Sequence, residues 1–552
     1  MSNFARRHAS SALALFAFTV LACAPDQGAR APRPRTFADL TALFADWRTF
    51  QRPPRVNGVP DYGTAAMAKQ QQGLPAMVQR LAALDTAGWP VSQRVDWHVV
   101  RAEMHGLDFD HRVLRPWVNN PAFYVTVFNE QSDQPAREGP FADGAVELWQ
   151  HAFPLSAASA ATIDSGIRVI PGLLAQARVN LVGNQKDLWT YGAKSIREQS
   201  VTLATLLPRV AGAPGGLEAS VRAAKEATDK LAEWLEKEAP SKSGTSGIGA
   251  TNYDWYLAHV QLVPLTWQKE VALMERELAR STAAIALEEA RNVRLPQLPV
   301  VASAAEHARR FGAGVTDYMT FLKSHDVMTL ASWMDAALRA RIGAYSTGPR
   351  EFFTEVDYRD PVAMRTHGYH WFDLGRMVHD PHADPIRRGP LLYNIFDTRT
   401  EGFATGWEEI AMHLGLFDAS PRSRELIYIL LAERAARALG DLHMQGSGYS
   451  LEQASKLAAD KTPRGWLSLK GNLVWFEQHL YLQQPGYGTS YVTGKLQMDQ
   501  LIADRKTQLG DAFTMRRVMD EINAAGLIPA SLLRWELTGV LSDDVRRMLE
   551  AP

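Results

Sequence analysis

A short segment in the C-terminal half of the chain concentrates side chains that bind metals. Two histidines and two aspartates fall within six residues of "HDPHADP", which runs from His379 to Pro385. Imidazole nitrogens and carboxylate oxygens are ligands that zinc accepts. Pro381 and Pro385 argue against a regular helix here, because a proline inside a helix removes an N–H and clashes with the preceding turn. The segment is open to three interpretations: a working metal centre, the remains of one, or a polar surface turn.

A further carboxylate follows at the start of the next predicted helix. Thr398 and Glu401 in "TRTE" have capping-box spacing, which predicts a helix start with Glu401 in its first turn. Glu401 then either caps this helix, which stabilises it by about 0.5–1 kcal/mol, or presents a metal ligand from a rigid element. Two other pairs of donors lie nearby. His367 and His370 have a loop-like spacing. Glu409 and His413 have the i, i+4 spacing of one helix face, and a solvated contact is the favoured alternative for them.

The elements that must position these residues are predicted to be helices. In 217–239, apolar residues recur at spacings of three, four or seven, after Gly216 and before Pro240. Similar patterns occupy 267–281, 423–440 and 513–522. Alternating strand patterns are scarce, and the clearest covers only "FYVTVF" at 123–128. We therefore expect a mainly α-helical fold with few short strands.

The N-terminal residues predict an export signal. Arg6 and Arg7 precede a short apolar run, 11–22, that is too short to span a bilayer as a mature helix. The run ends in "VLAC", which resembles the lipobox of bacterial lipoproteins, and Cys23 is the only cysteine in the chain. The alternative is an ordinary signal peptide with a chance cysteine. We predict a lipoprotein signal peptide at 1–22 and lipidation of Cys23.

The predicted address is the cell envelope. Ala24 follows the cysteine, which favours outer-membrane sorting with the body facing the periplasm. Residues 23–36, rich in Pro, Arg and Ala, are expected to be a flexible tether, and 37–552 a single large domain. The net charge of -1 and pI of about 7 give no reason to expect a nucleic-acid partner. No G-x-S-x-G elbow or P-loop is present, and the one cysteine is assigned to the lipid.

Several segments resemble one bacterial family. The stretch "EGFATGWEEIAMHLGLFD" is similar to the "EGWALYAE…LGLY" motif of the bacterial domain-of-unknown-function 885 proteins, which are related to helical zinc peptidases. Downstream, "QQPGYGTSYVTGKLQMDQL" is similar to that family's "PGQALSYKIGKLKILEL". Looser similarity extends over 94–117 and 247–257. The resemblance implies a large helical zinc-peptidase-like fold, with two lobes around a cleft as one arrangement.

The resemblance also implies a zinc site and a mechanism. The family's "HE-x-x-P-G-H" motif places its first histidine at His379 and its basic glutamate at Asp380. Its second histidine falls on Pro385, which cannot bind metal, so His382 is the substitute and Glu401 the third ligand. The motif is therefore degenerate. A metal-bound water would lose its proton to Asp380, because zinc lowers the pKa of such a water.

Three further residues receive roles from the same comparison. Tyr491 matches the family's "SYKIG" tyrosine and is expected to stabilise an oxyanion, or else to be a packed core tyrosine. Tyr487 stands where the family has glutamine, and Arg399 precedes Glu401; both are predicted to contact substrate, with helix capping as the alternative for Arg399. The predicted function is metal-dependent hydrolysis of a small peptide-like substrate. The alternative is a metal-free binding or assembly lipoprotein that keeps the fold.

Overall fold

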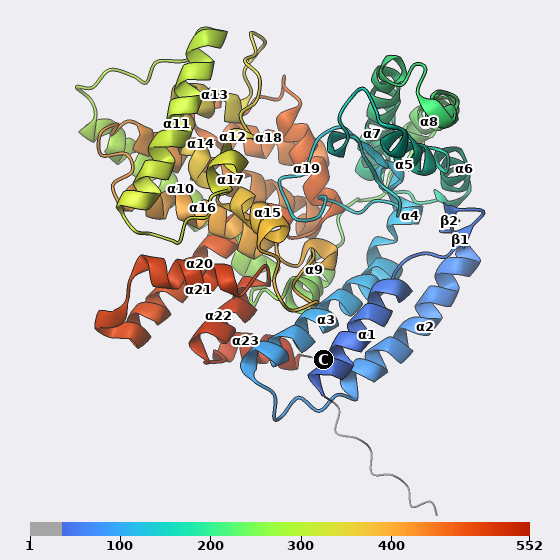
Figure 1. The fold of residues 1–552 in the computed structure, drawn as a ribbon, viewed down its shortest axis with the longest axis horizontal. Helices are drawn as coiled ribbons and strands as arrows, with labels where there is room; N and C mark the ends of the chain where they lie inside the picture. The colour runs from blue at the N-terminus through green and yellow to red at the C-terminus, as the bar shows by residue number, and fades with distance from the viewer. Residues whose placement is uncertain (1–35, 552) are drawn as a thin grey trace, which may run out of the picture.

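The computed structural model describes residues 36–551 and consists mainly of helices (Figure 1). This confirms the predicted fold class. The described residues form two short strand pairs. Strands β1 (Arg55–Val56) and β2 (Val59–Pro60) are antiparallel, and β3 (Val127–Phe128) and β4 (Val146–Glu147) are parallel. The predicted strand at 123–128 is therefore found only at its end, because Pro121–Tyr124 forms a 3₁₀ turn.

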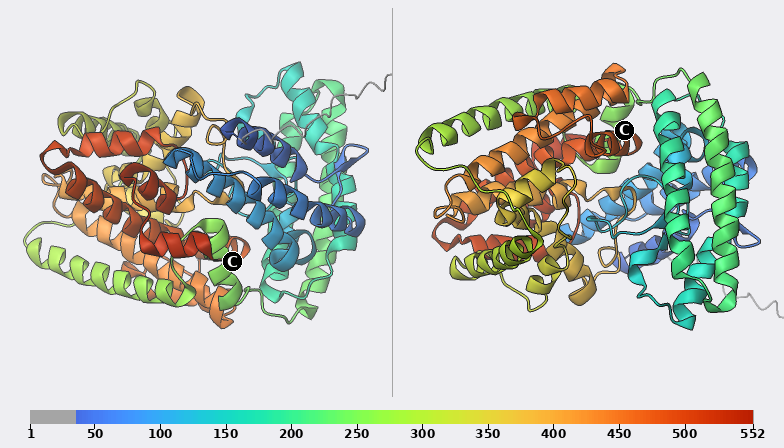
Figure 2. Two further views of the ribbon diagram at one scale, coloured as in Figure 1. Left: turned by 90° about the horizontal axis from the view of Figure 1, so that it is seen from below. Right: turned by 90° about the horizontal axis from the view of Figure 1, so that it is seen from above.

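The N-terminal half forms two groups of helices. The first group packs against the rest of the molecule through α3 and consists of α1 (Phe37–Phe50), α2 (Thr64–Ala82) and α3 (Val91–Phe109). A π-helical turn, Asp110–Leu114, continues α3 and leads into α4 (Pro116–Asn119). The second group has a hydrophobic core of its own and lies along one edge of the molecule (Figure 2). It consists of α5 (Ala157–Ile167), α6 (Ile170–Asn180), α7 (Lys186–Leu206) and α8 (Leu217–Glu238).

The C-terminal half is a larger helical body. Its helices are α9 (Ala250–Tyr256), α10 (Trp267–Arg291), α11 (Ala304–Ser324), α12 (Met334–Arg339), α13 (Phe352–Arg359), α14 (Pro361–His367), α15 (Tyr369–His379), α16 (Asp397–His413), α17 (Ser423–Ser447), α18 (Leu451–Lys461), α19 (Leu473–Gln483), α20 (Tyr487–Leu509), α21 (Met515–Ala524), α22 (Ala530–Thr538) and α23 (Asp543–Glu550). Helices α16, α17 and α20 are central: each is buried along most of its length. A helix that is buried all round must satisfy its polar side chains internally, and these three helices carry the polar network described below.

Several predicted boundaries differ from the observed ones. The helix predicted to end at Gly440 continues to Ser447, where Gly448 takes a positive φ of 76°. Gly440 lies inside this helix at a close contact, where a Cβ would lie 2.6 Å from the Gln478 side-chain oxygen and 3.1 Å from the Ala454 carbonyl oxygen. The proline-containing segment 380–391 is non-helical, as predicted.

The membrane-related predictions concern residues that the structure does not describe. The signal peptide, Cys23 and nearly all of the tether lie before residue 36. Within 36–551, none of the helices combines the length and the apolar character that crossing a bilayer requires.

Candidate metal centre

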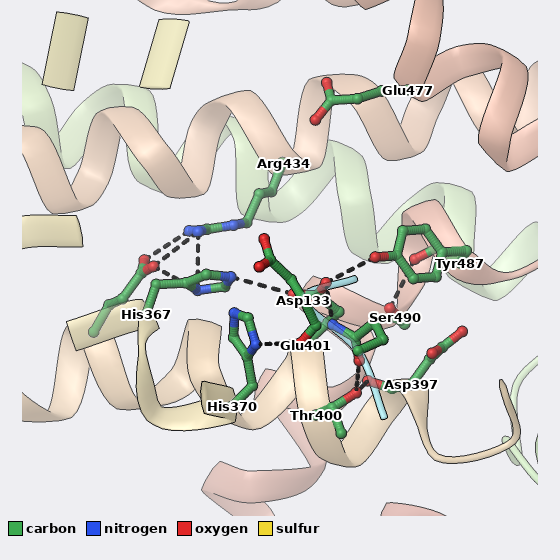
Figure 3. A network of polar contacts seen from close by, with 12 residues as sticks. Asp133, His367, His370, Asp397, Thr400, Glu401, Arg434, Glu477, Tyr487 and Ser490 are labelled. Atoms are coloured by element: carbon green, nitrogen blue, oxygen red, sulfur yellow. Dashed lines mark hydrogen bonds and ion pairs between the residues drawn. The ribbon is translucent and has the colours of Figure 1, made fainter. Parts of the chain in front are cut away.

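Glu401 is buried on α16, where α16 and α20 approach closely. The contact depends on facing glycines: a Cβ on Gly402 would lie 2.3 Å from the Gly494 Cα, and a Cβ on Gly494 would lie 2.1 Å from the Thr398 carbonyl oxygen. Any larger side chain would force the helices apart. This approach brings the N-terminal turns of α20, with Tyr487 and its neighbours, against the side chain of Glu401 (Figure 3).

The two carboxylate oxygens of Glu401 have different partners. Oε1 accepts hydrogen bonds from the Gln134 side-chain amide at 2.6 Å and from the Tyr487 hydroxyl at 2.8 Å. Oε2 lies 3.2 Å from Nε2 of His367. Gln134 is itself fixed, because its carbonyl accepts from the Thr400 hydroxyl at 2.5 Å. One oxygen is therefore held by two donors, and the other is directed to the histidines.

His367 ends α14 and is oriented through its outer ring nitrogen. Its Nδ1 lies 2.9 Å from Glu408 Oε1 and 3.1 Å from Nη2 of Arg434. Glu408 lies about two turns after Glu401 on the same face of α16. Its carboxylate accepts hydrogen bonds from both terminal nitrogens of Arg434, at 2.6 and 2.8 Å. The Arg434–Glu408 pair is fully buried. With Nδ1 facing Glu408, His367 presents Nε2 to Glu401.

His370 lies in the first turn of α15, and a backbone carbonyl orients its ring. Its Nδ1 lies 2.9 Å from the carbonyl oxygen of Asp133, in the loop between β3 and β4. Gly368 separates α14 from α15, and this break places the rings of His367 and His370 side by side, 4.8 Å apart at an angle of 73°. A carbonyl acceptor fixes the Nδ1–H tautomer, so the lone pair of His370 is on Nε2.

These three residues fit a divalent transition metal. One ligand atom from each of His367, His370 and Glu401 lies within 4.8 Å of the other two. A tetrahedral zinc with metal–ligand bonds of about 2.1 Å separates its ligand atoms by about 3.4 Å. The 3.2 Å between His367 and Glu401 already matches that spacing, and a small closure would bring in the third atom. A metal-binding histidine usually donates its other ring N–H to a carboxylate or a backbone carbonyl, and the Nδ1 atoms of these two histidines face such groups.

The electrostatics keep Glu401 ionised. Burial would raise the pKa of this carboxyl, but the hydrogen bond from His367, the charges of His370 and His367 and the Tyr487 hydroxyl lower it to about 2. Burial and the Arg434 charge would lower the pKa of His367, yet its hydrogen bonds to Glu401 and Glu408 raise it above its ordinary value. Burial, and then the charge of His367, lowers the pKa of His370. A metal would thus meet an ionised carboxylate and a neutral His370, and would displace a proton from His367.

The histidines and the aspartate predicted from the proline-containing segment lie elsewhere. His379 is exposed at the end of α15, and its ring stacks on Trp333 at 5.5 Å. Asp380 accepts a hydrogen bond from the Trp333 indole at 3.0 Å. His382 accepts from the backbone of Asp384 at 3.0 Å and lines a separate cavity of about 480 Å³, whose lining includes none of the three clustered residues. The structure therefore does not bring this segment to Glu401.

The remaining predicted site residues divide into two groups. Arg399 is fully buried and donates to both carboxylate oxygens of Asp373, at 3.0 and 3.2 Å, so its guanidinium is not free to hold a substrate carboxylate as predicted. Tyr487 and Tyr491 do lie at the cluster. The Tyr487 hydroxyl is already bonded to Glu401, which makes it a positioning group. The ring of Tyr491 stacks 6.4 Å from that of His367, and burial and then the Glu401 charge raise its pKa well above the ordinary value, so its hydroxyl keeps its proton.

The residues that sequence reasoning underrated are the ones brought together by tertiary contacts. His367 and His370 have a loop-like spacing that gave no helical signal. The sequence signal that could have placed them together is Gly368, which separates the short helices α14 and α15 and has one histidine on either side. Gln134 and Asp133 come from a loop more than 230 residues away and carry no local pattern.

Comparison with known proteins supports the resemblance in the C-terminal part. The family described as "Bacterial protein of unknown function (DUF885)" matches residues 377–537. The matched region contains Glu401, Tyr487 and Tyr491, whereas His367 and His370 precede it. No curated protein matches the chain.

Two solved structures share the fold over nearly the whole chain. One is a candidate lipoprotein of unknown function from Shewanella oneidensis, at 14% identity and a TM-score of 0.66, covering 91% of this chain and 99% of that one. The other is a candidate lipoprotein from Colwellia psychrerythraea, at 16% identity and a TM-score of 0.61, covering 94% and 98%. At such identities the similarity establishes the fold.

Proposed function

We propose that this chain is a lipid-anchored envelope protein that holds zinc at His367, His370 and Glu401 and hydrolyses peptide or related amide bonds. The observation that carries the proposal is the pairing of the outer atoms of all three residues. Glu408 and the Asp133 carbonyl take the Nδ1 atoms, and two donors take Glu401 Oε1. The remaining ligand atom of each residue points toward the other two, and these three atoms lie within 4.8 Å of one another.

The chemistry follows from this donor set. Zinc held by two imidazoles and one carboxylate keeps a position for water and lowers the pKa of that water. The chain's own residues supply the rest. Gln134 and Tyr487 keep the Glu401 carboxylate in one orientation. Tyr491, a protonated hydroxyl beside His367, is the donor we assign to the oxyanion that forms when the amide carbonyl is attacked.

Asp380 does not reach the cluster, so a zinc-bound water here would release its proton to solvent, and we assign to Glu477 on α19 the separate role of proton donor to the leaving amine. This carboxyl pairs with Arg437 through Oε1, and its buried Oε2 has no hydrogen-bond partner among the described residues. Burial raises its pKa; Arg437 lowers it, and Glu433 and Glu401 raise it further, so that it stands above the ordinary value. Figure 3 shows Glu477 apart from Glu401, with no contact drawn between the two side chains. A carboxyl that holds a proton near neutral pH suits transfer to a leaving amine.

The envelope location rests on the predicted lipobox and on the two similar structures, which are described as candidate lipoproteins. Replacement of Cys23 by serine should release the protein from the membrane fraction. A variant that still sediments with membranes would contradict the anchor.

The alternative function is a metal-free binding lipoprotein, and one observation favours it. A protonated His367 bridges Glu401 and Glu408, at 3.2 and 2.9 Å, so a proton alone satisfies this part of the network. Metal and proton therefore compete for the same nitrogen, as in other sites whose ligands must lose protons.

Metal content separates the two functions. The soluble body, without its lipid segment, is loaded with zinc, dialysed and analysed for metal per chain. We expect about one zinc in the wild type and in the control His379→Ala, and none in His367→Ala, His370→Ala or Glu401→Gln. Amide hydrolysis should follow the zinc. A wild type that retains no zinc, or variants that all retain it equally, would support the metal-free alternative.

A further inference from the structure

A second cavity, of about 400 Å³, lies between the N-terminal helices and the segments that lead to α16. Its lining includes the end of α1, part of α2 and residues within 136–141 and 390–394. Its volume is in the range of small-molecule sites. Aromatic rings form much of its wall: Tyr62, Trp117, Phe123, Phe141, Tyr256 and Tyr393.

Asp110 is the charged group in this wall that lacks a partner. It opens the π-helical turn after α3, and its carboxyl makes no hydrogen bond or ion pair within residues 36–551, although it is partly accessible from the cavity. The other enclosed charges are paired. Arg48 contacts Glu103 at 2.8 Å, and Arg137 contacts Glu147 at 2.8 Å. Likewise, Asp143 is paired with Arg55. Arg52 is exposed at the rim, where solvent and salt screen it.

The tyrosines beside Asp110 are held in place by the fold. Tyr393 and Asn394 both have left-handed φ angles, 57° and 48°, which non-glycine residues adopt only when the surroundings impose them. Tyr393 packs its ring on Gly106 of α3, where a Cβ would lie 2.3 Å from a ring carbon. Its hydroxyl makes no hydrogen bond within the described chain. The charge of Asp110 contributes, after burial, to raising the pKa of both Tyr256 and Tyr393.

The missing partner is costly to the folded protein. An ionised carboxylate enclosed by protein without a counter-ion is strongly disfavoured, and here burial raises the pKa of Asp110 to about 8. A bound cation would remove that penalty. Aromatic faces next to a carboxylate form the kind of enclosure that recognises organic ammonium groups.

We propose that this cavity binds an organic ammonium group, with Asp110 as its counter-ion and the rings of Tyr256 and Tyr393 as its walls. The cavity is linked to the candidate metal centre through two side chains. Gln484 lines it and also donates to Asp397, which lies one helical turn before Glu401, at 2.6 Å. An amine-bearing part of a substrate could therefore sit here. The binding itself does not depend on metal, so the inference stands separately from the proposed function.

Three probes of similar shape test the inference on the chelator-treated protein: 2-phenylethylammonium, neutral 2-phenylethanol and anionic 3-phenylpropanoate. Their affinities are measured by calorimetry at pH 9 for the wild type, Asp110→Asn and the control Asp108→Asn, whose aspartate pairs with Arg112 at the surface. We expect the wild type and the control to bind the ammonium at least tenfold more tightly than the alcohol. Asp110→Asn should lose that preference and should melt no lower than the wild type, because it removes a carboxylate that has no counter-ion.

The pH dependence gives a second readout. With a pKa of about 8, roughly one-tenth of Asp110 is ionised at pH 7 and nine-tenths at pH 9, so affinity for the ammonium should rise about tenfold between them. An amine with a pKa near that of lysine stays charged over this range. Equal binding of ammonium and alcohol, tighter binding of the carboxylate, no binding of any probe, or a preference that survives in Asp110→Asn would overturn the inference.

Discussion

Tyr487 and its neighbour Tyr481, whose rings lie 5.8 Å apart, provide a matched pair of substitutions. Tyr487 donates its hydroxyl to Glu401 Oε1 at 2.8 Å in a buried setting. Tyr481, on the neighbouring α19, is equally buried, but its hydroxyl has no hydrogen-bond partner within the described chain. Tyr487→Phe therefore deletes a hydrogen bond to a charged group, whereas Tyr481→Phe deletes a hydroxyl that contributes none.

The size of the difference follows from these contacts. A hydrogen bond to a charged group contributes about 1.5–3 kcal/mol, and Glu401 Oε1 keeps its bond from Gln134, so we expect about 1.5–2 kcal/mol for Tyr487→Phe. At about 2.1 cal/mol/K per residue, a body of roughly 500 residues loses about 1 °C of melting temperature per kcal/mol. Tyr487→Phe should thus melt about 2 °C lower, and Tyr481→Phe at the same temperature or higher.

The pH dependence of this effect has a definite sign. The folded pKa of Glu401, about 2, lies below its unfolded value, so its stabilisation is present above the unfolded pKa and is lost as pH falls through the folded one. Tyr487→Phe raises the folded pKa and so removes stability at neutral pH. Scanning calorimetry of both variants between pH 3 and 8 measures it, and the deficit of Tyr487→Phe should shrink as pH falls below the unfolded pKa of about 4.5. An equal loss in the two variants, or none in Tyr487→Phe, would refute the assignment of this hydroxyl.

Three other substitutions test separate parts of the structure. In the presence of a chelator, the raised folded pKa of His367 stabilises the folded protein fully below the unfolded pKa of about 6.5. This stabilisation is lost as pH rises through the folded pKa. The melting temperature of the wild type should therefore fall more steeply above about pH 6.5 than that of His367→Gln. Arg399→Met removes one of the two arginines that pair with the buried Asp373, the other being Arg376, and should lower unfolding stability by about 1.5–3 kcal/mol in chemical denaturation, with zinc content unchanged; full stability would contradict a structural role. Gly494→Ala places a Cβ 2.1 Å from the Thr398 carbonyl oxygen and should cost about 3 kcal/mol or more by the same measurement, and a neutral effect would mean that α16 and α20 separate easily.

The fold class and the position of Glu401 could be predicted from local patterns. Helical periodicity identified α8, α10 and α17, and "TRTE" located the start of α16 to within a residue or two. The predicted capping role failed, because Thr398 lies inside the helix and accepts from the Ala530 backbone at 3.3 Å, while Glu401 faces the histidines. Both side chains are engaged by tertiary contacts that a capping pattern does not include.

The ligand set could not be predicted in the same way. The proline-containing segment was rich in metal-binding side chains, yet His379 and Asp380 lie on the surface against Trp333. His367 and His370 become neighbours of Glu401 only because α14 and α15 pack on α16, and their tautomers depend on Asp133 and Glu408. Local composition measures donor density, whereas a metal site depends on convergence of side chains from different elements.

The most direct measurement is a crystal of the zinc-soaked protein with diffraction recorded on both sides of the zinc absorption edge. We expect one anomalous peak bounded by His367 Nε2, His370 Nε2 and Glu401 Oε2, with bonds of about 2.0–2.2 Å. A peak at His379 or His382 instead, or no peak at Glu401 in crystals that hold zinc elsewhere, would contradict a metal centre at the start of α16.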